Sequence, residues 1–547
     1  MSSSGPLVSS SSAVPTQSRL GVVVRTGNTP NAGTDDPIRF CLGTQCQSLN
    51  HANINDRQNR VAEAYTFTIP YTPRASVPYV ALETTTGTDA WRPVCLQVVL
   101  DGEPLYCREI SGLLIGNSTG ELVRFEDSAL NVNCASCLYG ALVGHTTQTS
   151  SELWVRAPGA TLVHVEYSTD ATFASFQQST AATPDAGADY NVHVMLAGLT
   201  AGTTYHYRVV LDGVPFHGAP HPTFTTAPAG PSSFVAAFGS CMDDRDDTAA
   251  WAEMPIFNHL AAQNPDLLLL LGDNHYANAN LLADRSLWLE ELRAHYRKTR
   301  TYAPFMQVVS TTPTYAIWDD HDFVGNNTAG ADYPVDRATA LQAFKEFWAN
   351  PTYGTGGTNG VWHSFTYGNV EFFMLDNRYW RAAPGGTMLG EQQLAWLTTG
   401  LMASTAAFKV VASGSIWHTG AGDSDSWGEH NAERESIIQS IFQSRVNGVI
   451  FLGGDIHKAG DWQIPTAVPG GYPLYDFVSS GLAQATTACG AAGSGEVRFA
   501  CLGGSQYYGL LRFAPDGATP SVTHEIRNAQ NAVVFSRQVL LSTLQVP

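Results

Sequence analysis

The pattern of apolar and polar positions divides the chain into three stretches. Residues 21–128 alternate apolar and polar positions in short runs broken by Gly, Asn, Asp and Pro, which is typical of a β-sandwich. A second stretch, residues 138–228, has similar short runs and predicts a second all-β sandwich. In residues 231–547 the pattern changes, and apolar runs typical of strands alternate with runs of helical period.

The helical runs of this last stretch lie at residues 251–263, 286–298, 337–349, 390–401 and 433–444. Strand patterns return after residue 470 and end in SVTHEIRNAQNAVVFSRQVLL. This order fits a fold in which two sheets pack face to face with helices outside. We therefore expect an α/β domain, an αββα sandwich, preceded by two all-β sandwich domains.

The amino-terminal segment and the overall charge argue against several classes of protein. Residues 1–20 begin MSSSGPLVSSSSAVPTQ and have neither a basic n-region nor an apolar h-region, so they predict a disordered lead. The chain has no run of about 18 apolar residues, so we expect no membrane-spanning helix. A formal net charge of -19 disfavours binding to nucleic acid or anionic membranes through bulk electrostatics. The sequence indicates no oligomeric state.

The cysteines predict an oxidising environment. Eight of the nine fall into close pairs, which are Cys41 and Cys46, Cys95 and Cys107, Cys134 and Cys137, and Cys489 and Cys501. The second pair flanks a hairpin pattern with Asp-Gly at its turn, which would bring the two strand ends face to face. Disulfides imply export, so we expect a secreted, periplasmic or cell-surface protein. Free buried thiols, or a zinc knuckle at the third pair, are the alternatives.

Five segments of the last stretch share one construction, an apolar strand pattern that ends in side chains able to bind metal. They are FVAAFGSC ending at Cys241, DLLLLLGDNHY ending at Tyr276, TYAIWDDHD ending at Asp322, VEFFMLDNR ending at Arg378, and FLGGDIHK with Asp455 and His457. Open α/β sheets usually bind ligands at the C-terminal ends of their strands. We therefore expect these side chains to form one site.

Two of these segments point to cations. Asp273 follows five consecutive leucines, so it lies at the mouth of a buried strand, where its two oxygens could bridge two metal ions. A capping or turn aspartate is the alternative. The segment from Asp319 to Asp322 contains three carboxylates and one imidazole in four residues, and such crowding of like charge is unfavourable unless cations or protons neutralise it. Its alternative is a solvated acidic loop.

Taken together, Gly-Ser-Cys, GDxxY, DDHD, LDxR and GDxH in this order resemble the PhoD-type alkaline phosphatases. These belong to the calcineurin-like metallophosphatase superfamily, which also contains the purple acid phosphatases. The resemblance spans residues 138–540. Within it, LxGLxxGTxYxYRV and TFTTAP make residues 138–228 similar to a fibronectin type III domain, while SLNHANINDR and TGTDAWRPVCLQVVLDGEPLY make residues 21–128 similar to a lipoxygenase-homology (PLAT) domain.

The resemblance implies a metal ligand set. It gives a ferric ion the thiolate of Cys241, the phenolate of Tyr276 and the ring of His457, with Asp273 as a bridge. A buried cysteine acting only as a small hydrophobe is the alternative for the first of these. The neighbouring position, which Asp273 would share, is rich in oxygen and suits a hard divalent cation, most simply calcium. Its other ligands would be Asp320 and Asp455.

The resemblance also implies roles for four further residues. His321 would be a general acid or phosphate stabiliser, or alternatively the partner of a carboxylate. Arg378 would hold phosphate oxygens as a fork, and its alternative is an ion pair with one of the site's own aspartates. Asn326 lies near the position of a family asparagine and is a candidate metal ligand. His418 lies where many superfamily members have another histidine, and we expect it to contact substrate.

The segment after His418 has a second interpretation. Its carboxylates, Asp423 and Asp425, could favour a cationic head group such as choline or ethanolamine, if the segment forms a mobile rim over the substrate. An exposed flexible loop is the alternative.

The function that the resemblance implies is a secreted metallophosphoesterase. Metal-bound hydroxide would attack phosphomonoesters, phosphodiesters or phospholipids, because PhoD-type relatives include alkaline phosphatases, phosphodiesterases and phospholipases D. The sandwich at residues 21–128 favours diesters or lipid-derived substrates through peripheral lipid contact. The alternative is an extracellular lipid- or glycan-binding protein with an inactive phosphatase-like domain.

Overall fold

The computed structural model describes residues 15–27, 37–50, 62–85, 90–110, 115, 121–126, 140–216, 220–246, 248–418, 425–490 and 496–547. Its contacts divide the chain into two compact units. Unit 1 contains Met1–Leu138, Ala157–Val163 and Arg208–Gly218, and unit 2 contains Tyr139–Arg156, His164–Tyr207 and Ala219–Pro547. The domain boundaries expected from the sequence remain predictions. No helix in the described part of the chain has both the length and the hydropathy of a membrane span.

Unit 1 is built from two four-stranded sheets. One has the order β4-β1-β6-β7, and the other β3-β2-β5-β8. Leu20, Val22 and Val24 alternate along the first strand and point into the core between the sheets. The bounds are β1 Gln17–Thr26, β2 Ile38–Leu42, β3 Gln45–Leu49, β4 Ala62–Pro70, β5 Tyr79–Thr84, β6 Pro93–Leu100, β7 Glu103–Glu109 and β8 Leu122–Glu126. Because β1 begins at Gln17, the ordered sandwich begins inside the segment expected to be a disordered lead.

Two of the four expected cysteine pairs each form a disulfide. Cys41 is bonded to Cys46, and Cys489 is bonded to Cys501. Cys95 and Cys107 are also disulfide-bonded. Their hairpin forms, but its register sets Cys107 opposite Gln97 and Cys95 opposite Glu109, so the two cysteines do not face each other. The third expected pair lies outside the described residues. Among the described cysteines, Cys241 is the free one.

The second β segment forms two small sheets, β13-β10-β9 and one with the order β12-β11-β14-β15, in which β16 pairs with β14. The bounds are β9 Leu142–Thr146, β10 Ser150–Arg156, β11 Val163–Ser168, β12 Gln177–Gln178, β13 Asn191–Ala197, β14 Thr204–Leu211, β15 Val214–Pro215 and β16 Thr223–Thr225. In unit 2 the indole N–H of Trp154 on β10 donates to the carbonyl of Glu346 at 3.0 Å. This hydrogen bond holds β10 against the helix α5, Arg337–Phe347.

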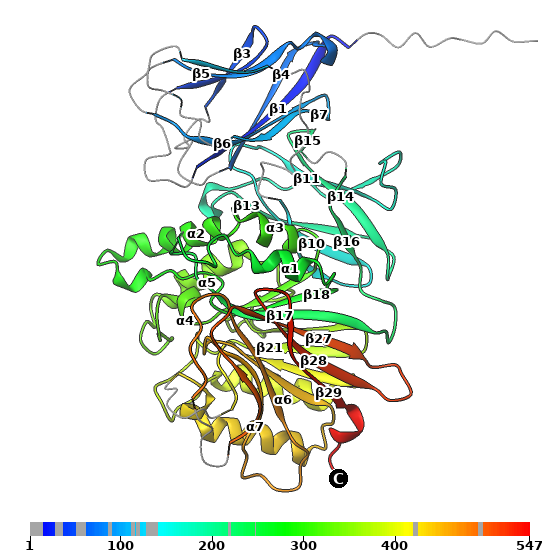
Figure 1. The fold of residues 1–547 in the computed structure, drawn as a ribbon, viewed down its shortest axis with the longest axis vertical. Helices are drawn as coiled ribbons and strands as arrows, with labels where there is room; N and C mark the ends of the chain where they lie inside the picture. Colours follow the sequence, from blue (N-terminus) through cyan, green and yellow to red (C-terminus); the bar gives the residue numbers. More distant parts are fainter. Residues whose placement is uncertain are drawn as a thin grey trace, which may run out of the picture. The chain divides into compact units, whose positions relative to one another are not determined.

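The remaining strands of unit 2 form two groups that join where β17 pairs with β25. Several of these strands, among them β17, β21 and β27, are labelled in Figure 1. One group contains β17, β18, β19 and β27 to β29, and the other contains β20 to β26. The bounds are β17 Phe234–Met242, β18 Leu267–Leu271, β19 Thr314–Ile317, β20 His363–Tyr367, β21 Val370–Met374, β22 Phe408–Ala412, β23 Val449–Gly453, β24 Ala459–Gln463, β25 Tyr475–Ala483, β26 Val497–Leu502, β27 Tyr507–Ala514, β28 Ser521–Asn528 and β29 Val533–Leu540. The expected combination of strands and helices is present, and the complete αββα layering remains a prediction.

The five helical runs of the sequence each contain a helix. The α-helices are α1 Ile256–Ala261, α2 Trp288–Thr299, α3 Ala303–Val309, α4 Asp320–Phe323, α5 Arg337–Phe347, α6 Gly390–Ala403 and α7 Asn431–Gln443. The short 3-10 helices are η1 Arg74–Ser76, η2 Ala186–Ala188, η3 Ala279–Leu281, η4 Arg285–Leu287, η5 Trp427–His430 and η6 Leu541–Thr543. The first run gives only a short helix because Pro255, which lacks an N–H donor, sits at its N-terminus.

Parallel pairing brings the strand ends together. Strands β17, β18 and β19 are parallel neighbours, and so are β22, β23 and β25. The five leucines of β18 are fully buried, as expected for a strand covered on both faces. Gly454 follows β23 where a Cβ would lie 2.5 Å from the carbonyl oxygen of Gly414 and 3.0 Å from that of Leu271. Glycine therefore allows three strand ends to approach closely.

Candidate metal centre

The predicted ligands gather at the C-terminal ends of these parallel strands. Cys241 lies near the end of β17, Asp273 follows β18, and Asp455 and His457 follow β23. The backbone N–H of Met242 donates to the carbonyl of Asp273 at 2.8 Å, which joins the first two ends. The single site expected from the five motifs therefore has a structural basis.

Four of these positions have a backbone conformation that non-glycine residues rarely adopt. The φ angles are 64° at Cys241, 50° at Asp273, 73° at Asp455 and 49° at His457. Such conformations are unfavourable by about 1–3 kcal/mol each, and they cluster where a function requires the side chains to be aimed. The turns direct the four side chains towards the candidate metal centre, although their backbone conformations are locally unfavourable.

Two serines that the sequence analysis did not identify hold these turns. The N–H of Asp455 donates to Ser240 Oγ at 3.3 Å, and that of His457 donates to Ser480 Oγ at 3.0 Å. Ser480 Oγ also lies 3.2 Å from Cys241 Sγ. Ser240 adjoins the cysteine in its motif and could have been identified, whereas Ser480 lies in the strand sequence DFVSSGLA, which carries no sign of a ligand site.

A first group of potential ligands contains Cys241, Asp273 and His457, whose ligand atoms all lie within 4.8 Å of one another. The sulfur is 3.7 Å from Asp273 Oδ2. The hydroxyl of Tyr276 lies 2.8 Å from His457 Nε2, so it adjoins the same group. The four side chains expected around a ferric ion therefore lie together.

A second group contains Asp273, Asp320 and His321, again with ligand atoms within 4.8 Å of one another. The carboxylate of Asp320 accepts hydrogen bonds from the N–H of Asn327 at 2.6 Å and of His321 at 2.7 Å. Asp273 belongs to both groups. Its role as a bridging carboxylate remains a prediction.

Cys241 and His457 stabilise each other's charged forms. Burial opposes ionisation of Cys241, but the His457 ring and nearby hydrogen-bond donors outweigh it and lower the pKa of the thiol. Burial likewise opposes a charged imidazole, and the Cys241 sulfur outweighs it and raises the pKa of His457. Burial, followed by the charges of Cys241 and Asp273, raises the pKa of Tyr276 well above its usual value. A phenolate at this position therefore requires a strong cation.

The carboxylates in and around the second group repel one another. Burial and the adjacent Asp320 raise the pKa of Asp273 well above its usual range. Burial, with Asp319 and Asp320, does the same to the pKa of Asp455, which is not a member of either group. A bound cation would remove this repulsion, and carboxylate oxygens suit a hard ion.

The ring of His321 stacks on that of Tyr276, with 4.1 Å between centroids. Its Nδ1 lies 3.2 Å from the carbonyl oxygen of Ala277, and because a carbonyl only accepts hydrogen bonds, Nδ1 carries the proton. Burial is the first cause of the lowered pKa of this ring, so the ring is neutral at neutral pH and Nε2 has a free lone pair. His321 must gain a proton at Nε2 before it can act as a general acid.

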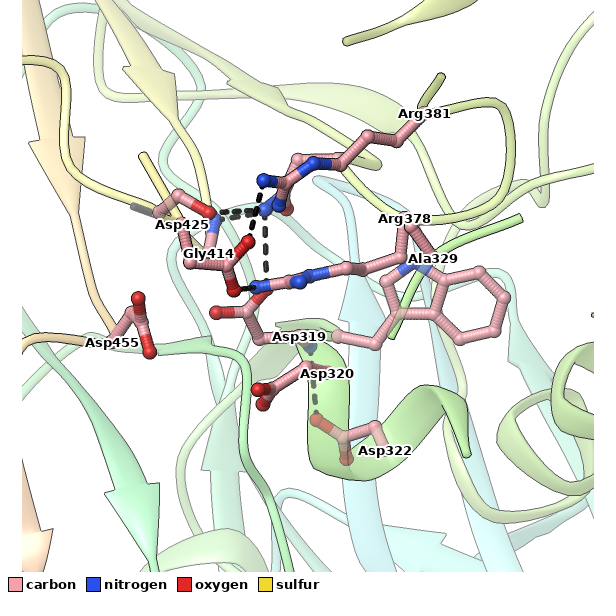
Figure 2. A network of polar contacts seen from close by, with 12 residues as sticks. Asp319, Asp320, Asp322, Ala329, Arg378, Arg381, Gly414, Asp425 and Asp455 are labelled. Carbon is pink, nitrogen blue, oxygen red and sulfur yellow. Dashed lines mark hydrogen bonds and ion pairs between the residues drawn. The ribbon is translucent and has the colours of Figure 1, made fainter. Parts of the chain in front are cut away.

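Arg378 adopts the alternative that the sequence left open, an ion pair with the site's own aspartates (Figure 2). Its side chain is 0% exposed, and Nε donates to Asp319 while a terminal nitrogen donates to Asp425 at 2.7 Å. A further nitrogen donates to the carbonyl of Thr328 at 3.3 Å. Arg381 bonds the second oxygen of Asp425 at 2.5 Å. Asp425 therefore binds arginines rather than standing free for a cationic head group.

The other predicted residues occupy less central positions. His418 is buried, with Nδ1 2.7 Å from Asp476 Oδ2 and its ring stacked on Trp462. Asn326 is exposed and donates its amide to Asn327. Their roles in binding substrate and metal remain predictions, and Asp423 lies outside the described residues.

Comparison with known proteins gives two matches to family descriptions. Residues 237–491 match the PhoD-like phosphatase domain, and residues 128–228 match the N-terminal domain of the PhoD-like phosphatases. The two matches together cover more than half of the chain. They include the five motifs Gly-Ser-Cys, GDxxY, DDHD, LDxR and GDxH.

Individual proteins agree with this result. Alkaline phosphatase D of Bacillus subtilis (strain 168) is 26% identical over 414 residues, 64% of this chain and 70% of that protein. A solved structure of PhoD has a TM-score of 0.61 at 21% identity and covers 76% of this chain and 93% of its own. A purple acid phosphatase from yellow lupin (Lupinus luteus) seeds has a TM-score of 0.56 at 13% identity, covering 96% and 90%. The two structures show a shared fold.

Proposed function

Since the chain belongs to the PhoD-like phosphatase family, we propose that this phosphoric ester hydrolase depends on two metal ions that share Asp273. The observation that carries the proposal is the membership of Asp273 in both ligand groups. One group offers sulfur and nitrogen besides oxygen, and the other is dominated by carboxylates. Two different cations fit such a divided site better than two identical ones.

We assign iron(III) to Cys241, Tyr276 and His457, and calcium to Asp320 and Asp455, with Asp273 between them. Thiolate, imidazole and phenolate are established ligands of iron in proteins, whereas calcium prefers carboxylate oxygens. The raised pKa of Tyr276 supports a trivalent ion, because a weaker cation would compete poorly with the phenol proton. When bound, such ions supply an activated water and neutralise negative charge on the phosphoryl group.

The chain's own residues orient the reaction. Asp273 fixes the two halves of the site relative to each other, because its backbone is hydrogen-bonded to β17 and its carboxylate accepts from His321 N–H at 3.2 Å. His321 Nε2 accepts a proton and can then deliver it to the leaving oxygen of the ester. Ser240 and Ser480 hold the turns that present Asp455 and His457.

The proposed substrates are phosphodiesters and phosphomonoesters, including phospholipid-derived ones. The unit 1 sandwich, which resembles lipid-binding domains in sequence, supports lipid-derived diesters. Rates with a monoester, a bis-aryl diester and phosphatidylcholine should be compared on one sample, and a profile confined to the monoester would contradict the diester proposal. We also propose that the protein functions outside the cytoplasm, since disulfides persist in oxidising compartments.

The metal proposal is tested with Asp273→Asn. This variant removes the shared charge, so we expect loss of both metals by elemental analysis, loss of visible absorption from an iron–phenolate, and loss of turnover. Asp266→Asn is a matched control, because Asp266 precedes β18 at its other end and accepts from Val235 N–H at 2.8 Å. Full metal content and turnover in Asp273→Asn would refute the proposal.

The alternative of an inactive lipid- or glycan-binding protein receives no support. Potential metal ligands gather in two groups, and the family relationship makes the chain a phosphoric ester hydrolase.

A further inference from the structure

Arg245 lies at the exposed side of the proposed iron site. It follows β17 by three residues, its side chain is 43% exposed, and its guanidinium carbon lies 4.8 Å from the centroid of the Tyr276 ring. The hydroxyl of that ring reaches His457. The guanidinium of Arg245 therefore lies against the ring of one predicted ligand, Tyr276, whose hydroxyl contacts another, His457.

The guanidinium is held in a fixed orientation. Nε and one terminal nitrogen of Arg245 donate to the two oxygens of Asp243, both at 2.9 Å. Asp243 is itself fixed, because Gln484 Nε2 donates to it at 3.1 Å and its N–H donates to the carbonyl of Ala483 at 2.7 Å. The other terminal nitrogen, Nη1, bonds none of the residues that the structure describes. The guanidinium is therefore preorganised, and its Nη1 is unbonded within the described part of the chain.

The other arginines of the site offer no donor that faces solvent. Arg378 is fully buried and donates to Asp319, Asp425 and a carbonyl. Arg381 is 6% exposed and donates to Asp425, and its Nη1, which has no hydrogen-bond partner among the described residues, is buried. An anionic phosphate that approaches the site also meets the carboxylates described above. A guanidinium that faces solvent offsets this repulsion and offers a charge-assisted hydrogen bond.

We propose that Arg245, through Nη1, binds a non-bridging oxygen of the substrate phosphate, the role that the sequence suggested for Arg378. This inference rests on the proposed function, because it places the phosphate at the same site. Arg245 would then bind substrate in addition to pairing with Asp243. The ligand class is a phosphate mono- or dianion.

The experiment compares Arg245→Gln and Arg245→Lys with wild type. We expect KM for an aryl phosphate and the competitive inhibition constant of inorganic phosphate each to rise about tenfold in Arg245→Gln, as for the loss of one charge-assisted hydrogen bond. Arg245→Lys keeps the charge without the fork and should give a smaller rise of both constants. Iron content and the visible band should remain at wild-type values.

Arg285→Gln is the matched control. Arg285 on η4 also pairs with a carboxylate, Asp336 at 2.7 Å, and also lies over an aromatic ring, Trp288 at 5.3 Å. Its replacement should leave both constants unchanged. Unchanged constants in Arg245→Gln, a fall in kcat alone, or loss of iron together with the rise would each overturn the inference. Failure of the proposed function itself is distinct, because the wild type would then lack metal or turnover.

Discussion

Replacing Arg378 by Met separates a structural role from phosphate binding. The substitution keeps a long unbranched side chain but removes every hydrogen bond of the guanidinium. It leaves Asp319 and Asp425, which are 1% and 8% exposed as side chains, without one of their cationic partners. Figure 2 shows this network, in which Arg381 also pairs with Asp425. Asp425 would therefore keep Arg381 as a partner in the variant.

The expected loss of unfolding free energy follows from this burial. Breaking a buried ion pair by removing one partner is unfavourable by about 3–5 kcal/mol, because the remaining charge stays buried. Burial already raises the pKa of Asp319 to about 7, and Arg378 is the largest influence that lowers it. Without Arg378 the carboxyl should keep its proton to higher pH. A carboxyl whose folded pKa is raised makes the folded state less stable as pH rises through that pKa. The unfolding free energy that Arg378→Met loses relative to wild type should therefore be larger at pH 8.5 than at pH 5.5.

The assay is urea unfolding followed by tryptophan fluorescence at both pH values. Arg512→Met serves as the control, because Arg512 is 38% exposed and pairs with Glu525 at 3.4 Å, an arrangement that contributes less than about 1 kcal/mol. If Arg378→Met unfolded at the wild-type urea concentration while KM for a phosphoester rose tenfold, the ion-pair explanation would be refuted and direct phosphate binding restored.

Two further predictions concern stability. His295 has a pKa of about 9, because Asp244 and Glu291 outweigh the effect of burial, so its contribution is complete below pH 6.5 and is lost as pH rises to 9. That loss amounts to about 3 kcal/mol and should disappear in His295→Gln, as measured by unfolding at several pH values. Gly454→Ala places a methyl group 2.5 Å from a backbone oxygen and should lower stability by about 1–3 kcal/mol, whereas Gly230→Ala, with open space around it, should not. Equal unfolding midpoints for the two alanine variants would contradict the packing argument.

Local patterns in the sequence predicted the order of the elements and proposed most of the metal ligands. The leucine run of β18 and the helical runs are local patterns. Each can be identified from a short window of sequence, because a strand and a helix each orient their side chains with a fixed period. Asp273 and Asp455 could be placed at one site because parallel strands end on the same side of a sheet. That rule needs no knowledge of side-chain packing.

Which side chains contact one another depends on how distant segments of the chain pack. The sequence could not choose between phosphate and aspartate as the partner of Arg378, because Asp319 and Asp425 reach it from separate segments. Ser480 is hydrogen-bonded to the Cys241 sulfur although 239 positions separate them. The hairpin register that offsets Cys95 from Cys107 depends on pairing along its whole length. Such contacts arise when distant segments pack and are desolvated together, and no local pattern in the chain encodes them.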